Sequence, residues 1–123
     1  MENAIRIILT FWADDDQILK YKGQENFHVA KTGDIYITVV KVLKVSKTYI
    51  DYEELEQEFL ENCKREETFI NQLKHLEGEF VLEIVPEFKR KDKPALIFDR
   101  NLIEFLGGLG KKFKNIDIDM YIW

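Results

Sequence analysis

The chain has 123 residues, of which 46% are hydrophobic, and its formal net charge is −5 at neutral pH. The apolar content excludes a disordered chain and is enough for one domain with a buried core. The acidic balance argues against nucleic acid as a partner, because binding to phosphates requires a basic surface. The single cysteine, Cys63, excludes an internal disulfide and favours a reducing compartment.

The first residues of the chain do not have the pattern of a secretion signal. Their short apolar run is interrupted by Arg6 and is followed by three aspartates at 14–16. No run in the sequence reaches the ~20 apolar residues that a membrane-spanning helix needs. We therefore expect a cytoplasmic protein with no membrane partner.

The first part of the chain is predicted to consist of strands and one short helix. Residues 4–13 are apolar on both alternating faces, which predicts an inner strand. Asp14 is placed to cap a short helix that ends at Gly23. A loop or a weak strand is expected over residues 24–34, with a turn at 32–34. The long β-branched run over 35–45 predicts a second inner strand.

A long central helix is the clearest element that the sequence predicts. It begins after Asp51, a favourable N-cap, and ends at Gly78, with a possible break at the polar stretch 64–68. At 100° per residue its apolar side chains share one face. They are Leu55, Phe59, Cys63, Ile70 and Leu73.

The segment after this helix is predicted to form a hairpin. Residues 79–88 alternate, with large apolar side chains on one face and Glu79, Glu83 and Glu87 on the other. The charged run 89–93 is typical of a hairpin tip, and residues 94–98 are expected to form the return strand.

The chain is then expected to end with a helix and a strand. Asp99 is placed to cap a helix that ends at glycines 107–110, and residues 114–123 are predicted to form the last strand. The predicted order is β-α-β-β-α-β-β-α-β in a single domain over residues 1–123. This order favours an α+β fold, with a mixed or mainly antiparallel sheet and helices packed on one face.

Catalytic chemistry has little support in the sequence. Neither histidine has a ligand partner at a suitable spacing, and glycines 107–110 end a helix, whereas a phosphate loop opens one. We therefore predict no catalytic residues, no metal and no cofactor. The alternative is a small metal-dependent enzyme that uses Asp14–Asp16 together with Asp117 and Asp119, which requires the two segments to meet in space.

The acidic content of the chain is concentrated in its central helix. Residues 51–67 hold eight acids and two bases, a local net charge of −6, and the rest of the chain sums to +1. Glu54, Glu58 and Glu61 form a ridge, and like charges at such spacing destabilise a helix by ~0.2–0.5 kcal/mol each. The ridge is therefore a candidate docking surface for a basic partner, with a solvated helix face as the alternative.

The last strand is a second candidate for partner binding. Side chains alternate along a strand, so one face carries acids and aromatic rings and the other carries apolar side chains, which we expect to join the core. The two acids are roughly 6–7 Å apart, too far to grip one small cation alone. The candidate partner-binding residues here are Asp117, Asp119, Tyr121 and Trp123. The predicted core residues are Ile116, Ile118, Met120 and Ile122.

The C-terminal sequence LIEFLGGLGKKFKNIDIDMYIW, with KTGD upstream at 31–34, resembles a family of short bacterial proteins filed as domain of unknown function 4279. The resemblance implies a small, intracellular, non-enzymatic domain, and it carries over no catalytic residues. Small domains of this kind are often immunity partners of secreted toxins, an association between fold size and function.

From these features we expect a non-catalytic immunity-type protein. It would bind and neutralise a cognate toxin domain, such as a basic nuclease, through an acidic surface. The alternatives left open are the metal-dependent enzyme and a regulatory or oligomerising domain, and the sequence does not fix the oligomeric state.

Overall fold

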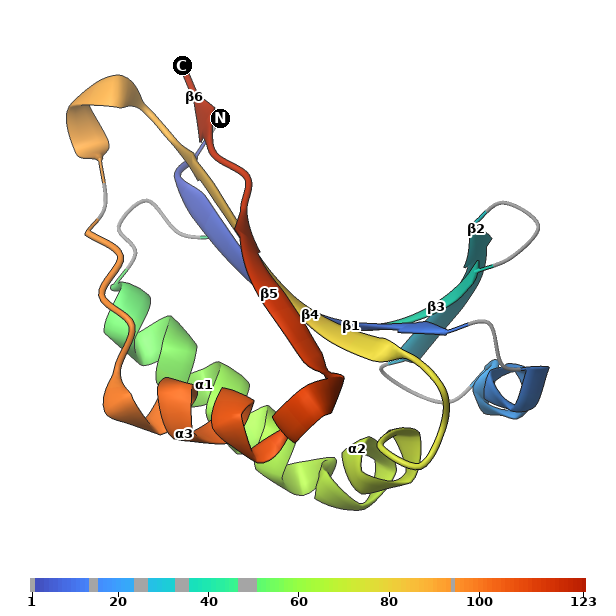
Figure 1. The fold of residues 1–123 in the computed structure, drawn as a ribbon. Coiled ribbons are helices and arrows are strands. Elements are labelled where there is room, and N and C mark those ends of the chain that lie inside the picture. Colours follow the sequence, from blue (N-terminus) through green and yellow to red (C-terminus); the bar gives the residue numbers. More distant parts are fainter. Residues whose placement is uncertain (1, 14–15, 24–26, 33–35, 47–50, 94) are drawn as a thin grey trace.

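The computed structural model describes residues 2–13, 16–23, 27–32, 36–46, 51–93 and 95–123. Its strands are β1 (Ala4–Ala13), β2 (Phe27–Thr32), β3 (Tyr36–Ser46), β4 (Glu79–Phe88), β5 (Phe113–Ile118) and β6 (Tyr121–Ile122). Its helices are α1 (Tyr52–Arg65), α2 (Glu67–Leu73) and α3 (Arg100–Gly108), with 3₁₀ turns η1 (Asp16–Tyr21), η2 (Arg90–Asp92) and η3 (Gly110–Lys112). Helices and a mixed sheet together make an α+β fold, as predicted (Figure 1).

The strands lie in the order β2-β3-β1-β4-β5, and β6 continues along β4 beyond β5. β1 pairs antiparallel with both β3 and β4, and β2 pairs antiparallel with β3. β5 and β6 pair parallel to β4. The two strands predicted to be inner ones, β1 and β3, each have a neighbour on both sides, which confirms that prediction.

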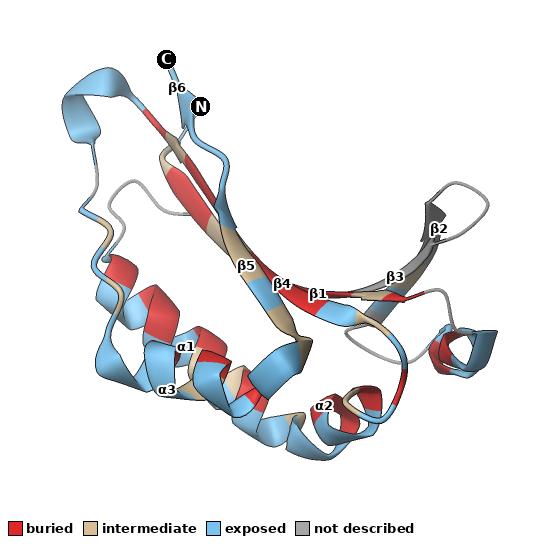
Figure 2. Cartoon of the chain, viewed as in Figure 1, coloured by how far each residue is buried: buried red, intermediate tan, exposed pale blue. Residues whose placement is uncertain are grey.

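The helices cover one face of the sheet, and the core lies between the two layers (Figures 1 and 2). The apolar face predicted for the central helix is buried, including Cys63 at 2% exposure. The predicted break also occurs, because α1 ends at Arg65, Glu66 lies between the helices, and α2 begins at Glu67. The helix residues of the core pack against alternate side chains of the two central strands. These include Ile5, Ile7, Leu9, Phe11, Phe80, Leu82 and Ile84.

Two of the predicted helix caps are present. The Asp51 carboxylate accepts a hydrogen bond from the amide of Glu53 at 3.0 Å, and the Asp99 carboxylate accepts one from Arg100 at 2.7 Å. The short helix predicted before Gly23 is the 3₁₀ turn η1. Its expected cap, Asp14, lies outside the described residues, as do residues 33 and 34 of the turn expected at 32–34.

The hairpin predicted over residues 89–98 is wrong. Residues 95–98 pair with no strand, and η2 forms within the charged run. The side of β4 that a return strand would occupy is taken by β5 and β6, which reach it after α3. Residues 95–99 instead lead to α3, where the Phe98 ring packs edge-on against Tyr52 at 6.2 Å between ring centres.

The single last strand predicted over 114–123 is also wrong in detail, since it is divided into β5 and β6. The Ile84 carbonyl accepts a hydrogen bond from the amide of Asp119 at 2.9 Å. The backbone of Pro86, two residues along β4, must face the same side. Proline has no N–H, so the ladder lacks one hydrogen bond where β5 stops.

The apolar face of this last segment was predicted to join the core, and that holds only at its beginning. Ile116 packs against the core cluster. Ile118, Met120 and Ile122 are 44%, 47% and 53% exposed, so the prediction is wrong for them. The helix layer ends before it reaches β6, so β6 and the segment that leads to it are not covered by helices (Figure 2).

Candidate functional site

The sheet face opposite the helices, here called the open face, carries a broad hollow of about 1070 Å³. Side chains alternate along each strand, so the residues between the core positions of β1, β4 and β5 all point to this face. The hollow lies at the end of β1, across β4 and along the start of β5. Its described lining is Trp12, Ala13, Glu77, Gly78, Glu79, Val81, Glu83, Lys114, Asn115 and Asp117.

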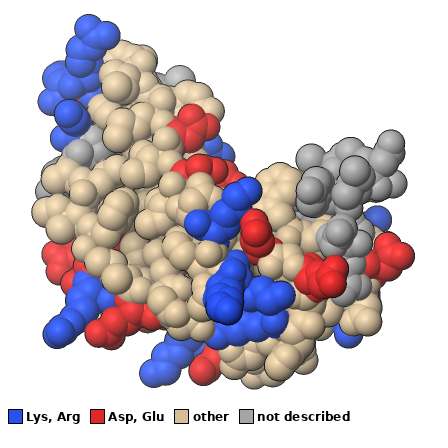
Figure 3. Space-filling model, in the orientation of Figure 1, with Lys and Arg blue, Asp and Glu red and all other residues tan. Residues whose placement is uncertain are grey.

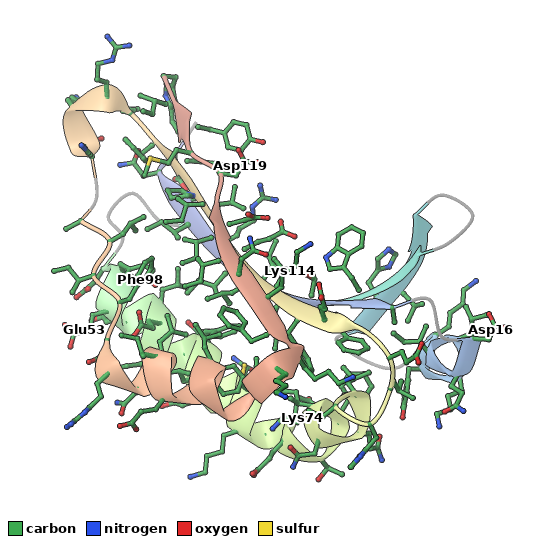
Figure 4. The ribbon with its side chains drawn as sticks, in the orientation of Figure 1. Asp16, Glu53, Lys74, Phe98, Lys114 and Asp119 are labelled. Atoms are coloured by element: carbon green, nitrogen blue, oxygen red, sulfur yellow. The ribbon has the colours of Figure 1, made fainter. Side chains whose placement is uncertain are left out.

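The lining of the hollow is mainly acidic, with four carboxylates and one amine. The amine belongs to Lys114, whose Nζ lies 3.8 Å from an oxygen of Glu79. Both of these side chains are more than half exposed, so their attraction is weak. Figure 3 shows acidic and basic side chains together on this side of the molecule, and Figure 4 labels Lys114 at the start of β5.

A pair of adjacent acids lines the hollow on β4 and β5. Glu83 and Asp117 occupy directly paired positions on β4 and β5. Burial raises the pKa of Glu83, and the nearby charges of Asp117 and Asp119 raise it further, while Arg6 acts in the opposite direction. The Arg6 guanidinium is itself bound to Glu87 at 2.8 Å. The field at this part of the open face is therefore negative, and it favours a positive group.

Trp12 supplies an aromatic wall at the end of β1, where it is paired with Glu79 of β4. Its indole N–H donates to the Thr10 hydroxyl at 3.2 Å, and that hydroxyl donates to the Val81 carbonyl at 3.2 Å. The first bond lies within β1 and the second links β1 to β4, and together they hold the ring in place. A fixed indole ring next to carboxylates suits a lysine or arginine side chain, because a cation is attracted both by the acids and by the ring face.

The predicted residues of the last strand lie on the same open face. Asp117 lines the hollow, and its carboxylate accepts from the Asn115 amide at 2.8 Å. Asp119 lies further along and accepts from the Tyr121 hydroxyl at 3.1 Å, which raises the pKa of Tyr121. Trp123 follows at the end of the strand and is 40% exposed. This half of the predicted set is therefore one continuous surface with the hollow.

The other half of the predicted set lies elsewhere. Glu54, Glu58 and Glu61 are exposed on α1, whose apolar face packs against the opposite side of the sheet. The sheet and the helix layer therefore separate this acidic ridge from the open face. The structure does not combine the two predicted surfaces into one site.

The metal hypothesis requires Asp14–Asp16 to lie near Asp117 and Asp119, and the described residues of these two segments are far apart. Asp16 and Asp119 lie on well-separated parts of the molecule in Figure 4, and Asp14 and Asp15 lie outside the described residues. Among the described residues, no group of three or more His, Cys, Asp or Glu side chains is placed to hold a metal ion.

The sequence patterns did not single out Trp12, Glu83 or Lys114 as site residues. The alternation over residues 79–88 did place the glutamates away from the core. It could not show which strand would lie beside them, and the pairing of Glu83 with Asp117 depends on that neighbour.

Comparisons with models of protein families, with curated proteins and with solved structures each found no match to this chain. The resemblance to domain of unknown function 4279 therefore stays a prediction. In the described part of the chain, no helix combines the length and apolar character needed to cross a membrane.

Proposed function

We propose that this chain is a non-catalytic binding protein of the immunity type, which captures a basic toxin domain on its open face. The observation that carries the proposal is the acid-lined hollow beside Trp12. A cytoplasmic location, expected from the sequence, belongs to the same proposal. The hollow offers carboxylates and an aromatic wall, which fit a partner that presents lysine or arginine side chains.

The pair of acids formed by Glu83 and Asp117 supports a role in binding in preference to a purely structural role. Like charges in directly paired positions of neighbouring strands destabilise a sheet. Glu83 and Asp117 hold such positions, so they oppose each other in the free protein. A cation placed between them would remove this repulsion on binding. A second basic side chain of the partner, at the Trp12 ring beside Glu79, would add about 0.5–2 kcal/mol by cation–π attraction.

The open face fits this role better than the ridge on α1. A side chain that enters the hollow meets groups from β1, β4 and β5 and loses part of its water. The carboxylates of Glu54, Glu58 and Glu61 are exposed, so water and salt screen them strongly. The ridge is therefore expected to attract a partner over distance and to contribute little to the final complex.

The proposal is tested with the product of the neighbouring gene, where an immunity protein would have its toxin. Co-expression should rescue growth from that toxin, and the two proteins should co-purify. The double change Glu83→Gln with Asp117→Asn keeps the shape of the hollow and removes two charges. It should weaken the complex by about tenfold or more, which corresponds to about 1.4 kcal/mol.

The matched control is the double change Glu54→Gln with Glu58→Gln, which removes the same charge from α1. At ~500 mM salt, where exposed charges are screened, it should change the dissociation constant by about twofold or less. Absence of both rescue and co-purification would reject the immunity function. Equal weakening by the two doubles would show that net charge, and not the hollow, determines binding.

A further inference from the structure

The outer edge of β5 and β6 is a free sheet edge in the part of the chain that the structure describes, since no described strand pairs with it. The direction of its backbone groups follows from the hydrogen bonds to β4. The amides of Asp119 and Trp123 donate to the carbonyls of Ile84 and Phe88 at 2.9 and 3.2 Å. The alternate residues between them must therefore turn their backbone groups outward.

The outward groups are those of Ile118, Met120 and Ile122. The same three residues are 44–53% exposed, so solvent and partners reach this edge. An accessible edge with apolar side chains and unused N–H and C=O groups is a template for one more strand. Lysine and proline are two of the residues that protect such edges; Lys114 lies near the start of β5, and neither residue occurs over 115–123.

We propose that this edge binds an extended segment of the basic partner as an added β-strand. The inference rests on the proposed function and specifies how the partner is held. Backbone hydrogen bonds to the edge would supply affinity, and side chains on the two faces would select the sequence of the strand.

The two faces of the edge define the chemistry of that strand. On the open face, the added strand would lie beside Asp117 and Asp119, within the distance over which cross-strand pairs interact. On the other face it would lie beside Ile118 and Met120. The matching strand therefore alternates lysine or arginine with apolar residues. Its basic side chains point to the same face as the hollow.

A second copy of this chain is a poor match for the edge, because it would bring acidic side chains to an acidic strand. Two copies related by a two-fold axis would pair their β5 edges antiparallel. In the register centred on Ile118, Asp117 of each copy would lie opposite Asp119 of the other, and like charges opposed across strands are destabilising. This register therefore favours a basic strand over a second copy.

The test uses two synthetic peptides of equal composition with blocked ends. One is Lys-Val-Lys-Val-Lys-Val-Lys, and the other has block order, Lys-Lys-Lys-Lys-Val-Val-Val. Amide hydrogen exchange is followed by NMR on the complete chain. The alternating peptide should slow exchange about tenfold or more at Ile118 and Met120, because their outward amides gain hydrogen bonds. The amide of Asp119 already bonds to β4 and should change little.

A proline substitution isolates the contribution of the edge. Ile118→Pro removes an outward N–H and no bond to β4, and it should weaken binding of the alternating peptide by about tenfold. Ile118→Val is the matched control, keeps the amide and should bind as the unchanged protein does. Met120→Pro, between β5 and β6, is a second variant with the same expected result if Ile118→Pro impairs folding.

Equal binding of both peptides, or no change in exchange at the outward amides, would overturn the strand-addition inference and leave the proposed function intact. A dimer in light scattering that Ile118→Pro abolishes would also overturn it, since a second copy would then occupy the edge. The proposed function fails separately. Its failure is shown if Glu83→Gln with Asp117→Asn leaves binding of both peptides and of the toxin domain unchanged.

Discussion

Among single residues, Glu83 has the most informative ionisation. Burial raises its pKa, and Asp117 and Asp119 raise it further. A raised pKa means that the folded protein holds the proton more tightly than the unfolded chain does. The stabilisation from this proton is complete below the unfolded pKa of about 4.3 and is lost as pH rises through the folded pKa. Glu83→Gln should therefore raise the melting temperature by a few degrees at neutral pH.

The pH dependence of this change provides its check. Thermal unfolding followed by circular dichroism should show the gain from Glu83→Gln at pH 7 and little gain below about pH 4, where the natural side chain is also neutral. Glu79→Gln is the control on the same strand, since Glu79 is more than half exposed and lies near Lys114. A gain from Glu83→Gln that is equal at both pH values would contradict the assignment.

Glu56 is the buried acid of α1, at 2% exposure, and it has a structural role. Its Oε1 accepts a hydrogen bond at 3.1 Å from the amide of Asp99, the residue that caps α3. Glu56→Ala should lower the free energy of unfolding by about 1–3 kcal/mol, because it leaves that amide without its partner. Glu56→Gln keeps an acceptor and should cost less at neutral pH, since burial raises the pKa of the natural carboxyl. Urea unfolding compares the two, and equal losses would show that the hydrogen bond is unimportant.

At the scale of elements, the turn into β4 depends on a glycine. Gly78 has φ of +154°, and a Cβ built there would lie 2.5 Å from the carbonyl oxygen of Trp12. Gly78→Ala should therefore destabilise the fold by about 2 kcal/mol or more, since backbone must move to accept it. Gly107→Ala, inside α3 with open space around it, should instead stabilise by about 0.5–1 kcal/mol. Chemical denaturation of both variants measures this contrast, and a tolerated alanine at position 78 would contradict it.

The elements also show what the sequence can and cannot predict. β1, β4 and the cap of α1 at Asp51 follow from local patterns of apolar spacing and capping, and all were predicted. The hairpin over 89–98 could not be decided from local sequence, because any later strand of the chain could pair with the free side of β4. The exposure of Ile118 depends likewise on where the helix layer ends. The alternation predicted which face Glu83 points to. That Asp117 lies next to it could be seen only from the pairing of β4 and β5.

At the scale of the whole molecule, the acidic charge is divided between two surfaces with different expected roles. The segment 51–67 carries a net charge of −6, although its ridge lies on α1, away from the hollow. Exposed charges far from an interface accelerate association and are screened by salt, whereas buried contacts mainly determine dissociation. The two sets of acids should therefore affect different rate constants of the same complex.

The corresponding measurement is the kinetics of toxin-domain binding by surface plasmon resonance at low and high ionic strength. The triple change Glu54→Gln, Glu58→Gln and Glu61→Gln should slow association by about threefold to tenfold at ~20 mM salt, with no effect at ~500 mM. Its dissociation rate should stay unchanged. Glu83→Gln with Asp117→Asn should speed dissociation at both salt concentrations, because those acids line the hollow that is proposed as the contact. If the triple change speeds dissociation and the double change does not, the ridge on α1 is the interface and the open face is not.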